Sequence, residues 1–138
     1  MYSINRDGVS MGTFFEKCKF WRYTLIVVKD TNNFIFGGFC CETWKKSTKF
    51  YGTGESFLFT LRDQNEPVVF RWTGENDQIQ WANEQSLGLG GGILGRFGIF
   101  IKDNFFKGSS SKTSTFNNEV LSSKQDFVVT MLEVWGFE

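Results

Sequence analysis

The feature that most constrains this sequence is a series of short apolar runs that alternate with period two and are separated by turn-forming residues. SFLFTLR (56–62) and PVVFRWT (67–73) both show this alternation, and DQNE (63–66) lies between them. Alternation with period two indicates a β-strand, and two such runs around a short polar turn indicate a hairpin. We therefore expect paired strands here, with Pro67 at the first position of its strand, where its missing N–H is tolerated.

A second hairpin is predicted nearer the N-terminus. RYTLIVVKD (22–30) is rich in β-branched and aromatic residues, DTNN (30–33) is a turn sequence, and FIFGGFCCE (34–42) resumes the extended pattern. Gly37 and Gly38 interrupt the second strand, which indicates either a β-bulge or a place where another backbone or a ring approaches closely.

Three further strands are expected. QIQWA (78–82) follows the turn TGEND, and RFGIFIKD (96–103) leads into a turn at Asp103 and Asn104. DFVVTMLEVWGFE (126–138) carries apolar residues on both of its faces. This last pattern predicts a central strand that is covered on both sides.

Two segments depart from the strand pattern. Ser10 or Thr13 is expected to cap a short helix that continues to about Phe20, and Thr13 with Glu16 has the spacing of a capping box, but the pattern does not choose between the two starts. GSSSKTSTFNNE (108–119) is polar and of low complexity, which predicts a surface loop.

Together these elements predict a mainly β (α+β) fold, a two-layer antiparallel β-sandwich with one or two short helices at its edge. The 138 residues correspond to a single domain, residues 1–138, with one core. Because each run is half apolar, one face of each sheet is expected to contact water. We expect Phe57, Phe59 and Leu61 to share the apolar face of their strand.

Composition excludes several classes of function. Fifteen basic and fifteen acidic residues give no net charge, so nothing attracts the chain generally to nucleic acid or to anionic lipid. There is no signal peptide and no apolar run of membrane-spanning length, which predicts a soluble intracellular protein without direct membrane insertion. The absence of histidine excludes Ser-His and Cys-His nucleophilic catalysis.

The run GLGGGILGRFG (88–98) contains the GxGxxG spacing of a dinucleotide-binding turn at Gly90, Gly92 and Gly95. Such a turn must open a helix and be followed by an acidic residue about 20 positions later. Here a predicted strand follows instead of a helix. The segment after that strand contains no acidic residue before Glu119. We therefore expect the glycines to lie where the backbone crosses closely beneath bulky aromatic rings, with no room for a side chain.

Glu55, in YGTGE (51–55), has two interpretations. It could act as a base or bind a cation, but it has no carboxylate partner near it in sequence. The favoured interpretation is that its carboxylate accepts backbone N–H bonds and fixes the entry to the following strand.

Cys18, Cys40 and Cys41 form an odd set, which argues against a disulfide scaffold. Cys18 is the best candidate for a redox-active thiol because Lys17 and Lys19 flank it, although neighbouring residues of a helix point to different sides. At least one residue of the Cys40–Cys41 pair is expected to be a small buried apolar residue. Three cysteines without histidine do not form a zinc site.

The order of motifs resembles that of the TLDc domain of the oxidation-resistance family. The resemblance covers nearly the whole chain and rests on YSINRDGVSMGTFF, LIVVKDTNNFIFGGFC, FYGTGESFLFTL, FRWTGEND, LGLGGG before FG, and the terminal WGFE. The family's characteristic residues correspond here to a set that we expect to be mostly fold-defining: Asp30, Gly52, Gly54, Glu55, Trp72, Gly74, Gly90, Gly91, Gly92, Gly98, Trp135 and Glu138.

The resemblance implies a β-sandwich and a non-enzymatic role, with no catalytic residue, metal or cofactor. It implies binding to the cytosolic sector of the vacuolar proton-pumping ATPase and a link to oxidative-stress resistance. With no further domain before Met1 or after Glu138, the sequence corresponds to a minimal member, a fragment or an excised domain. Two other functions stay open, namely direct antioxidant chemistry through a thiol and a scaffold role in a larger stable assembly. An exposed aromatic cluster would favour docking on a protein.

Overall fold

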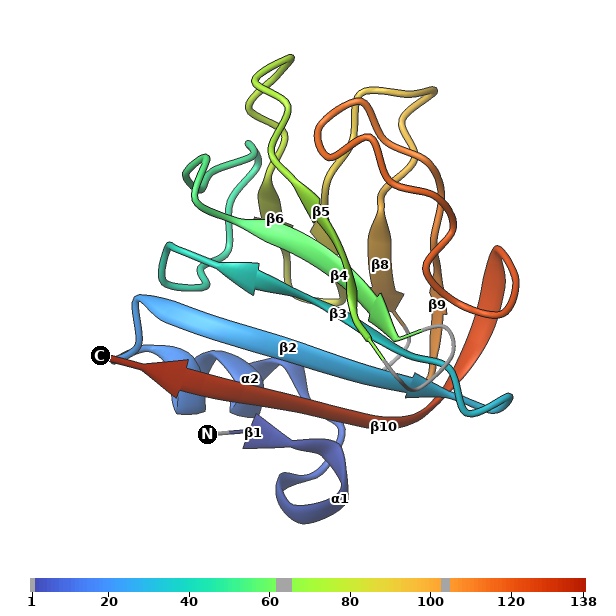
Figure 1. The fold of residues 1–138 in the computed structure, drawn as a ribbon. Coiled ribbons are helices and arrows are strands. Elements are labelled where there is room, and N and C mark those ends of the chain that lie inside the picture. The colour runs from blue at the N-terminus through green and yellow to red at the C-terminus, as the bar shows by residue number, and fades with distance from the viewer. Residues whose placement is uncertain (1, 62–65, 103–104) are drawn as a thin grey trace.

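The strands and helices of the protein are defined by a computed structural model, which describes residues 2–61, 66–102 and 105–138 (Figure 1). Ten strands and two helices lie within these residues. The strands are β1 (Tyr2–Ser3), β2 (Tyr23–Asp30), β3 (Ile35–Cys40), β4 (Phe57–Leu61), β5 (Val68–Arg71), β6 (Gln80–Ala82), β7 (Leu87–Leu89), β8 (Ile99–Lys102), β9 (Lys107–Ser109) and β10 (Asp126–Phe137), and the helices are α1 (Ile4–Asp7) and α2 (Met11–Cys18).

The strands form two layers that share β10. The first sheet has the order β5-β4-β3-β2-β10, with β1 on the other side of β10, and the second has the order β10-β9-β8-β7-β6. Residues 126–128 of β10 pair with β9, and residues 129–137 pair with β2. The change of partner lies beside a register shift between Val129 and Met131. The predicted antiparallel β-sandwich is confirmed, and β10 is central as expected.

Side chains from the inner faces of both sheets meet in one hydrophobic core. Fully burying a side chain of this kind contributes about 1.5–3 kcal/mol to stability. The strand residues of this core alternate along the chain and have almost no exposed surface, namely Ile26, Val28, Phe36, Leu58, Leu89, Ile99, Ile101, Leu132 and Val134.

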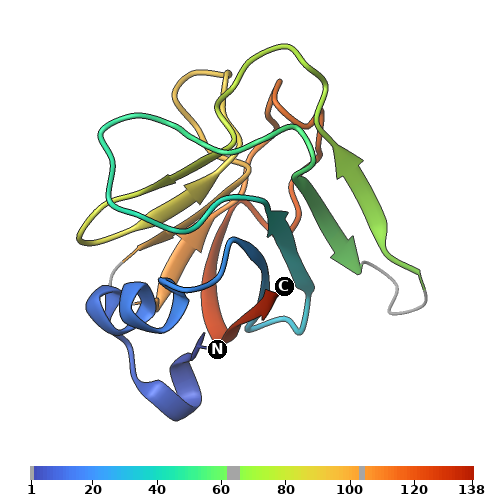
Figure 2. The ribbon, with the colours of Figure 1, turned by 90° about the vertical axis from the view of Figure 1, so that its left-hand side faces the viewer.

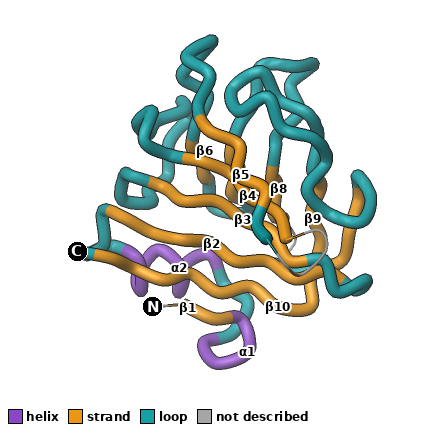
Figure 3. The backbone as a smooth tube through the Cα atoms, viewed as in Figure 1, coloured by secondary structure: helices purple, strands orange, loops and turns teal. Residues whose placement is uncertain are grey.

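The two helices gather at one end of the molecule, beside β1 and β10 (Figure 3). Ser10 caps α2, because its Oγ accepts a hydrogen bond from the N–H of Thr13 at 3.3 Å. This contact settles the choice of helix start that the sequence leaves open. The helix packs through Met11, Phe14 and Cys18, which are buried. Tyr2 pairs with Val134, and both chain ends lie on the same side of the molecule in the two views (Figure 1, Figure 2).

Both predicted hairpins are confirmed, since β2 pairs with β3 and β4 with β5. The sequence pattern misses β1, which has two residues, and β7 and β9, which have three residues with a central glycine and carry no β-branched or aromatic residue. Pro67 precedes β5, which begins at Val68. The predicted turn at Asp103 and Asn104, and positions 63–65 of the predicted DQNE turn, lie outside the described residues.

Gly37 lies where three strands approach one another closely. A Cβ atom at this position would lie 1.8 Å from the carbonyl oxygen of Ile26 and 3.0 Å from a ring carbon of Phe59. The register of β3 with β2 and β4 runs through Gly37 without a shift. Of the two predicted explanations for the paired glycines, the close approach is therefore correct and the bulge is not.

The prediction of a surface loop at 108–119 is wrong. Half of its polar side chains are buried, and some of them form hydrogen bonds with the glycine run and with the loop after β5. The N–H of Gly91 donates to Thr115 Oγ1 at 2.9 Å, and the N–H of Ser114 donates to the carbonyl of Gly91 at 3.1 Å. The Oγ1 of Thr115 also donates to Asn76 Oδ1 at 2.7 Å. Serine and threonine can be buried here because other backbone and side-chain groups satisfy their hydroxyls.

The glycine run opens no helix, as expected, and instead leads into a short hairpin and β8. Gly92 has a φ of 91°, and a Cβ atom there would lie 1.9 Å from Ser114 Oγ. The tight crossing is required because the loop 108–119 packs directly on this backbone.

We expect Gly92→Val to lower the free energy of unfolding by about 2–4 kcal/mol, because the side chain would clash and would force a disfavoured φ. Urea denaturation monitored by circular dichroism measures the change. Gly74→Asn is the matched control, since Gly74 also has a positive φ of 82° but no atom lies within 4 Å of the added Cβ. An unchanged stability for Gly92→Val would contradict the steric explanation.

Candidate functional site

The outward side of the first sheet, which faces away from the second sheet, is largely apolar. In β2 burial alternates strictly, so that the even-numbered residues from Thr24 to Asp30 are buried and the odd-numbered residues from Tyr23 to Lys29 are partly exposed. The exposed set still includes Leu25. A sheet with one packed face normally places polar side chains on the other face, so this outward surface departs from the usual pattern.

One row of side chains crosses five strands on this side. Trp135 lies opposite Leu25, Leu25 opposite Phe39, Phe39 opposite Phe57, and Phe57 opposite Arg71. Directly opposed residues of antiparallel strands point to the same face of the sheet. The row is therefore continuous and ends in a cation at the edge strand β5.

Aromatic contacts hold this surface together. The rings of Tyr23 and Phe39 stack with centroids 6.3 Å apart, and those of Phe39 and Phe57 with centroids 5.4 Å apart. Trp135 and Phe137 nevertheless expose 48% and 46% of their surface. We call this surface the outward aromatic face and define it by Tyr23, Leu25, Phe39, Phe57, Val69, Trp135 and Phe137.

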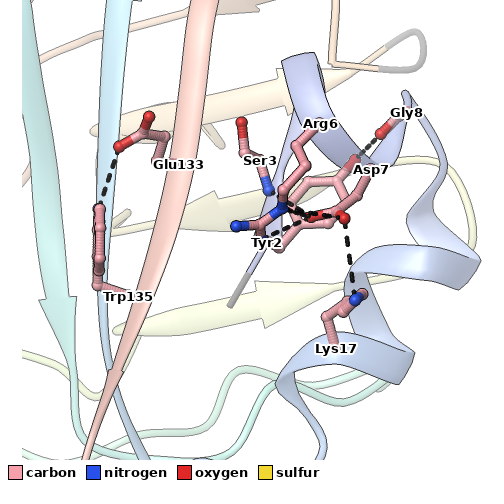
Figure 4. A network of polar contacts seen from close by, with 8 residues as sticks. All are labelled: Tyr2, Ser3, Arg6, Asp7, Gly8, Lys17, Glu133 and Trp135. Atoms are coloured by element: carbon pink, nitrogen blue, oxygen red, sulfur yellow. Dashed lines mark hydrogen bonds and ion pairs between the residues drawn. The ribbon is translucent and has the colours of Figure 1, made fainter.

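Charged groups border the outward aromatic face. The guanidinium of Arg22 lies 5.3 Å from the ring centre of Tyr23. On β10 the indole Nε1 of Trp135 donates to Glu133 Oε1 at 3.2 Å (Figure 4). An apolar centre with a charged rim is the usual composition of a protein-binding surface.

A second polar cluster fixes α1 beside this border (Figure 4). Asp7 Oδ2 accepts hydrogen bonds from Arg6 Nη2 at 2.9 Å and from the N–H of Ser3 at 3.0 Å, and Lys17 Nζ lies 3.8 Å from Asp7 Oδ1. The hydrogen bonds from Arg6 lower the pKa of Asp7 to about 2. A cavity of about 330 Å³ next to this cluster is lined by Tyr2, Ser3, Arg6, Glu133, Val134 and Trp135.

Sequence patterns did not locate this surface. The prediction that β10 is covered on both faces is wrong, because Trp135 and Phe137 are exposed. The predicted apolar face of β4, with Phe57 and Phe59, is the outward one, whereas Leu58 on the opposite face enters the core. Both faces of these strands are apolar, so alternation alone cannot tell which face meets the second sheet.

Asp30 is a fully buried carboxylate that joins two distant loops. Its Oδ1 accepts the N–H groups of Asn32 at 2.9 Å and Phe34 at 3.0 Å, within the turn between β2 and β3. Its Oδ2 accepts the hydroxyl of Ser122 at 2.5 Å, and the N–H and hydroxyl of Ser123 at 3.1 and 2.9 Å. Burial alone would raise the pKa of Asp30, but the hydrogen bonds outweigh it and lower the pKa below the usual value.

The motif YGTGE is arranged differently from the prediction. Glu55 is exposed, and no hydrogen bond to its carboxylate is formed within the described residues, so the expectation that it fixes the strand entry is wrong. Glu42 takes that role, because its Oε2 accepts the N–H of Gly52 at 2.9 Å. Gly54 is needed because Trp72 packs on it, and a Cβ atom there would lie 2.2 Å from the indole. Sequence distance concealed Glu42, which lies ten residues before Gly52.

The other predicted signature residues are spread over the molecule. Trp135 belongs to the outward aromatic face. Gly90 lies beneath the ring of Phe116, which would be 3.0 Å from a Cβ atom at this position. Glu138 is exposed after β10. The remaining positions lie in turns and close crossings away from this face, namely Gly74, Gly91, Gly92 and Gly98.

All three cysteines are free and buried. Burial raises the pKa of the Cys18 thiol to about 12, and burial also raises the pKa of Cys40. The lysines beside Cys18 interact with carboxylates instead, Lys17 with Asp7 and Lys19 with Glu16. The structure therefore gives Cys18 neither the exposure nor the thiolate stabilisation that a redox-active thiol needs.

Comparison of the sequence with known proteins identifies the family of the chain. The family model of the TLDc domain matches residues 1–138. The chain belongs to the TLDc family. The TLDc chain is 43% identical to mouse (Mus musculus) nuclear receptor coactivator 7 over 138 residues, which cover 99% of this chain and 14% of that protein. It is 39% identical to Xenopus laevis oxidation resistance protein 1 over 139 residues, covering 100% of this chain and 16% of that protein.

This TLDc chain thus spans only about one sixth of the length of these relatives. Within its described residues no helix is long and apolar enough to cross a membrane. No group of three or more Cys, Asp or Glu residues that could hold a metal ion lies within the same part of the chain.

In this TLDc domain we expect Asp30→Asn to lower the free energy of unfolding by about 2–4 kcal/mol at neutral pH, because the amide cannot replace the charged acceptor of five hydrogen bonds. The folded-state pKa lies below the unfolded value of about 3.9, so this contribution is present above about pH 4 and is lost as the pH falls through the folded pKa. The difference between wild type and Asp30→Asn should therefore shrink in acid.

Chemical denaturation at several pH values measures this difference. Glu84→Gln, at an exposed carboxylate, is the control. A difference that stays constant down to the acid limit would show that the ionised form of Asp30 has no special role.

A second expectation concerns the thiols of this TLDc domain. Since all three are buried and the pKa of Cys18 is raised to about 12, the native protein should react with dithionitrobenzoate at pH 8 at least about a hundredfold more slowly than the unfolded protein. Absorbance of the released thiolate measures the rate. Rapid modification of one thiol in the native state would restore the redox interpretation.

Proposed function

We propose that this TLDc chain is a non-enzymatic, intracellular protein-interaction domain that binds the cytosolic sector of the vacuolar proton-pumping ATPase and contributes to resistance against oxidative stress. Membership of the TLDc family and a relative named oxidation resistance protein 1 support the proposal. The outward aromatic face is the observation that carries it, because apolar side chains that gather partly exposed on one face of a folded domain mark an interaction surface.

The energetics of the outward aromatic face suit binding to a protein. Trp135 and Phe137 are large rings that each still expose nearly half of their surface, and tryptophan is enriched among the residues that dominate binding energy. The stacked rings of Tyr23, Phe39 and Phe57 hold the remaining surface in one conformation. A rigid surface loses little conformational entropy on association.

The alternative of direct thiol chemistry is less well supported, because each cysteine is buried. A scaffold role in a stable assembly uses the same outward aromatic face and differs in the lifetime of the complex. Co-purification that resists high salt would favour the scaffold role, whereas exchange within minutes would favour regulated binding.

We expect the double variant Trp135→Ser, Phe137→Ser to bind the purified cytosolic sector of the vacuolar ATPase at least about tenfold more weakly than the wild type, because the two most exposed rings of the outward aromatic face are lost. Biolayer interferometry measures the affinity. Val9→Ser, at a residue that is 50% exposed outside this face, is the control and should bind as the wild type does.

Failure of the wild type to bind the sector would remove the proposed partner. Equal binding by the double variant would instead place the contact outside the outward aromatic face. Thermal unfolding of each variant verifies that the domain is folded.

A further inference from the structure

The glycine run carries an exposed hairpin tip. Ile93 and Arg96 form an antiparallel bridge, and the N–H of Arg96 donates to the carbonyl of Ile93 at 2.9 Å. Between them Leu94 and Gly95 have φ values of 51° and 68°. Two central residues with positive φ define a type I′ turn, which prefers Asn, Asp or Gly at both positions. Leucine is among the residues least suited to the place it occupies.

Leu94 buries little of its surface in return for this strain. Four described residues other than glycine have a positive φ, and two of them, Asn33 and Asn117, are of the type that tolerates it. Phe105 is strained but buried in the core, so its packing offsets the strain. The side chain of Leu94 is 85% exposed. Residues that violate local rules without compensation within the fold are typical of functional positions.

The tip is held in a fixed position. The N–H of Ser111 donates to the carbonyl of Phe97 at 3.0 Å, and the loop 108–119 is bonded to Gly91 on the other side of the hairpin. These loops gather at the upper end of the molecule (Figure 1). Hydrogen bonds on both sides of the hairpin order its backbone before binding, which lowers the entropic cost of inserting the tip into a pocket.

Charge around the tip indicates what kind of pocket fits. Ile93, which is 40% exposed, and Arg96 line a shallow cavity of about 260 Å³ together with Lys112. Glu119 lies 3.4 Å from Lys112, whereas Arg96 forms no salt bridge within the described residues. A single unpaired cation attracts an anionic membrane only weakly, but it pairs well with one carboxylate at the rim of a protein pocket.

We propose that the Ile93–Leu94 tip is a docking anchor, with Leu94 inserting into an apolar pocket of a protein partner and Arg96 facing an acidic group at the rim of that pocket. The anchor rests on the proposed function in that it requires a protein partner, but it does not require that this partner be the vacuolar ATPase. It adds a second contact, distinct from the outward aromatic face.

Leu94→Asn tests the anchor without unfolding the domain. Asparagine suits the first central position of a type I′ turn, so the melting temperature should rise by about 2–4 °C. Binding to the purified cytosolic sector of the vacuolar ATPase should fall at least about tenfold. Phe20→Asn is the matched control, because Phe20 is 83% exposed in another part of the molecule, and its binding should not change. Unchanged binding by Leu94→Asn would overturn the anchor.

If the wild type does not bind that sector, the proposed partner fails and a second experiment decides on the anchor. In the probe, a photo-crosslinking residue replaces Ile93 in the full chain. The probe is irradiated in cell extract, either with excess wild-type protein or with excess Leu94→Asn protein as competitor. A protein adduct that wild type removes and Leu94→Asn leaves intact supports the anchor. Equal competition by both, or no protein adduct, overturns it.

A membrane is the other possible target of an apolar tip. Vesicles of phosphatidylcholine and phosphatidylserine provide that probe in a sedimentation assay. Sedimentation of the wild type that is lost in Leu94→Asn would assign the tip to lipid and overturn the protein pocket. Absence of sedimentation agrees with the proposal.

Discussion

The carboxylate of Asp30 is the interaction on which the arrangement of the two sheets depends. It lies at the end of β2, accepts hydrogen bonds from the turn that leads to β3, and accepts three more from Ser122 and Ser123, just before β10 begins. β10 is the strand that passes from one sheet to the other. A single buried carboxylate therefore connects the first hairpin to the segment that leads into β10. All of its hydrogen-bond donors are neutral N–H and O–H groups.

Local sequence patterns were sufficient for the elements that depend on near neighbours. The two hairpins follow from alternation and turn residues, and the sequence narrows the cap of α2 to Ser10 or Thr13. They were insufficient where the partner lies far away along the chain. The hydroxyl of Thr115, in the segment 108–119, is buried because the glycine run and the loop at Asn76 satisfy it, and no property of the segment itself indicates those partners.

The same limit applies to the candidate site. The strands β4 and β10 are apolar on both faces. Their sequences therefore indicate that either face can be buried, but they do not show which face remains exposed. Only the order of the strands shows that Leu25, Phe39 and Trp135 line up on the side without a second sheet. Interaction surfaces built on strands are hidden from sequence for this reason, because the side chains that form them are those that would also form a core.

The buried serine and threonine segment also determines which hydroxyls enzymes can reach. Ser110, Thr113 and Thr115 have 2% or less of their surface exposed. A hydroxyl that is buried and hydrogen-bonded becomes accessible to an enzyme only when its segment opens locally. By composition the segment resembles a regulatory tail that could be phosphorylated, but in the folded domain these three hydroxyls are part of the interior.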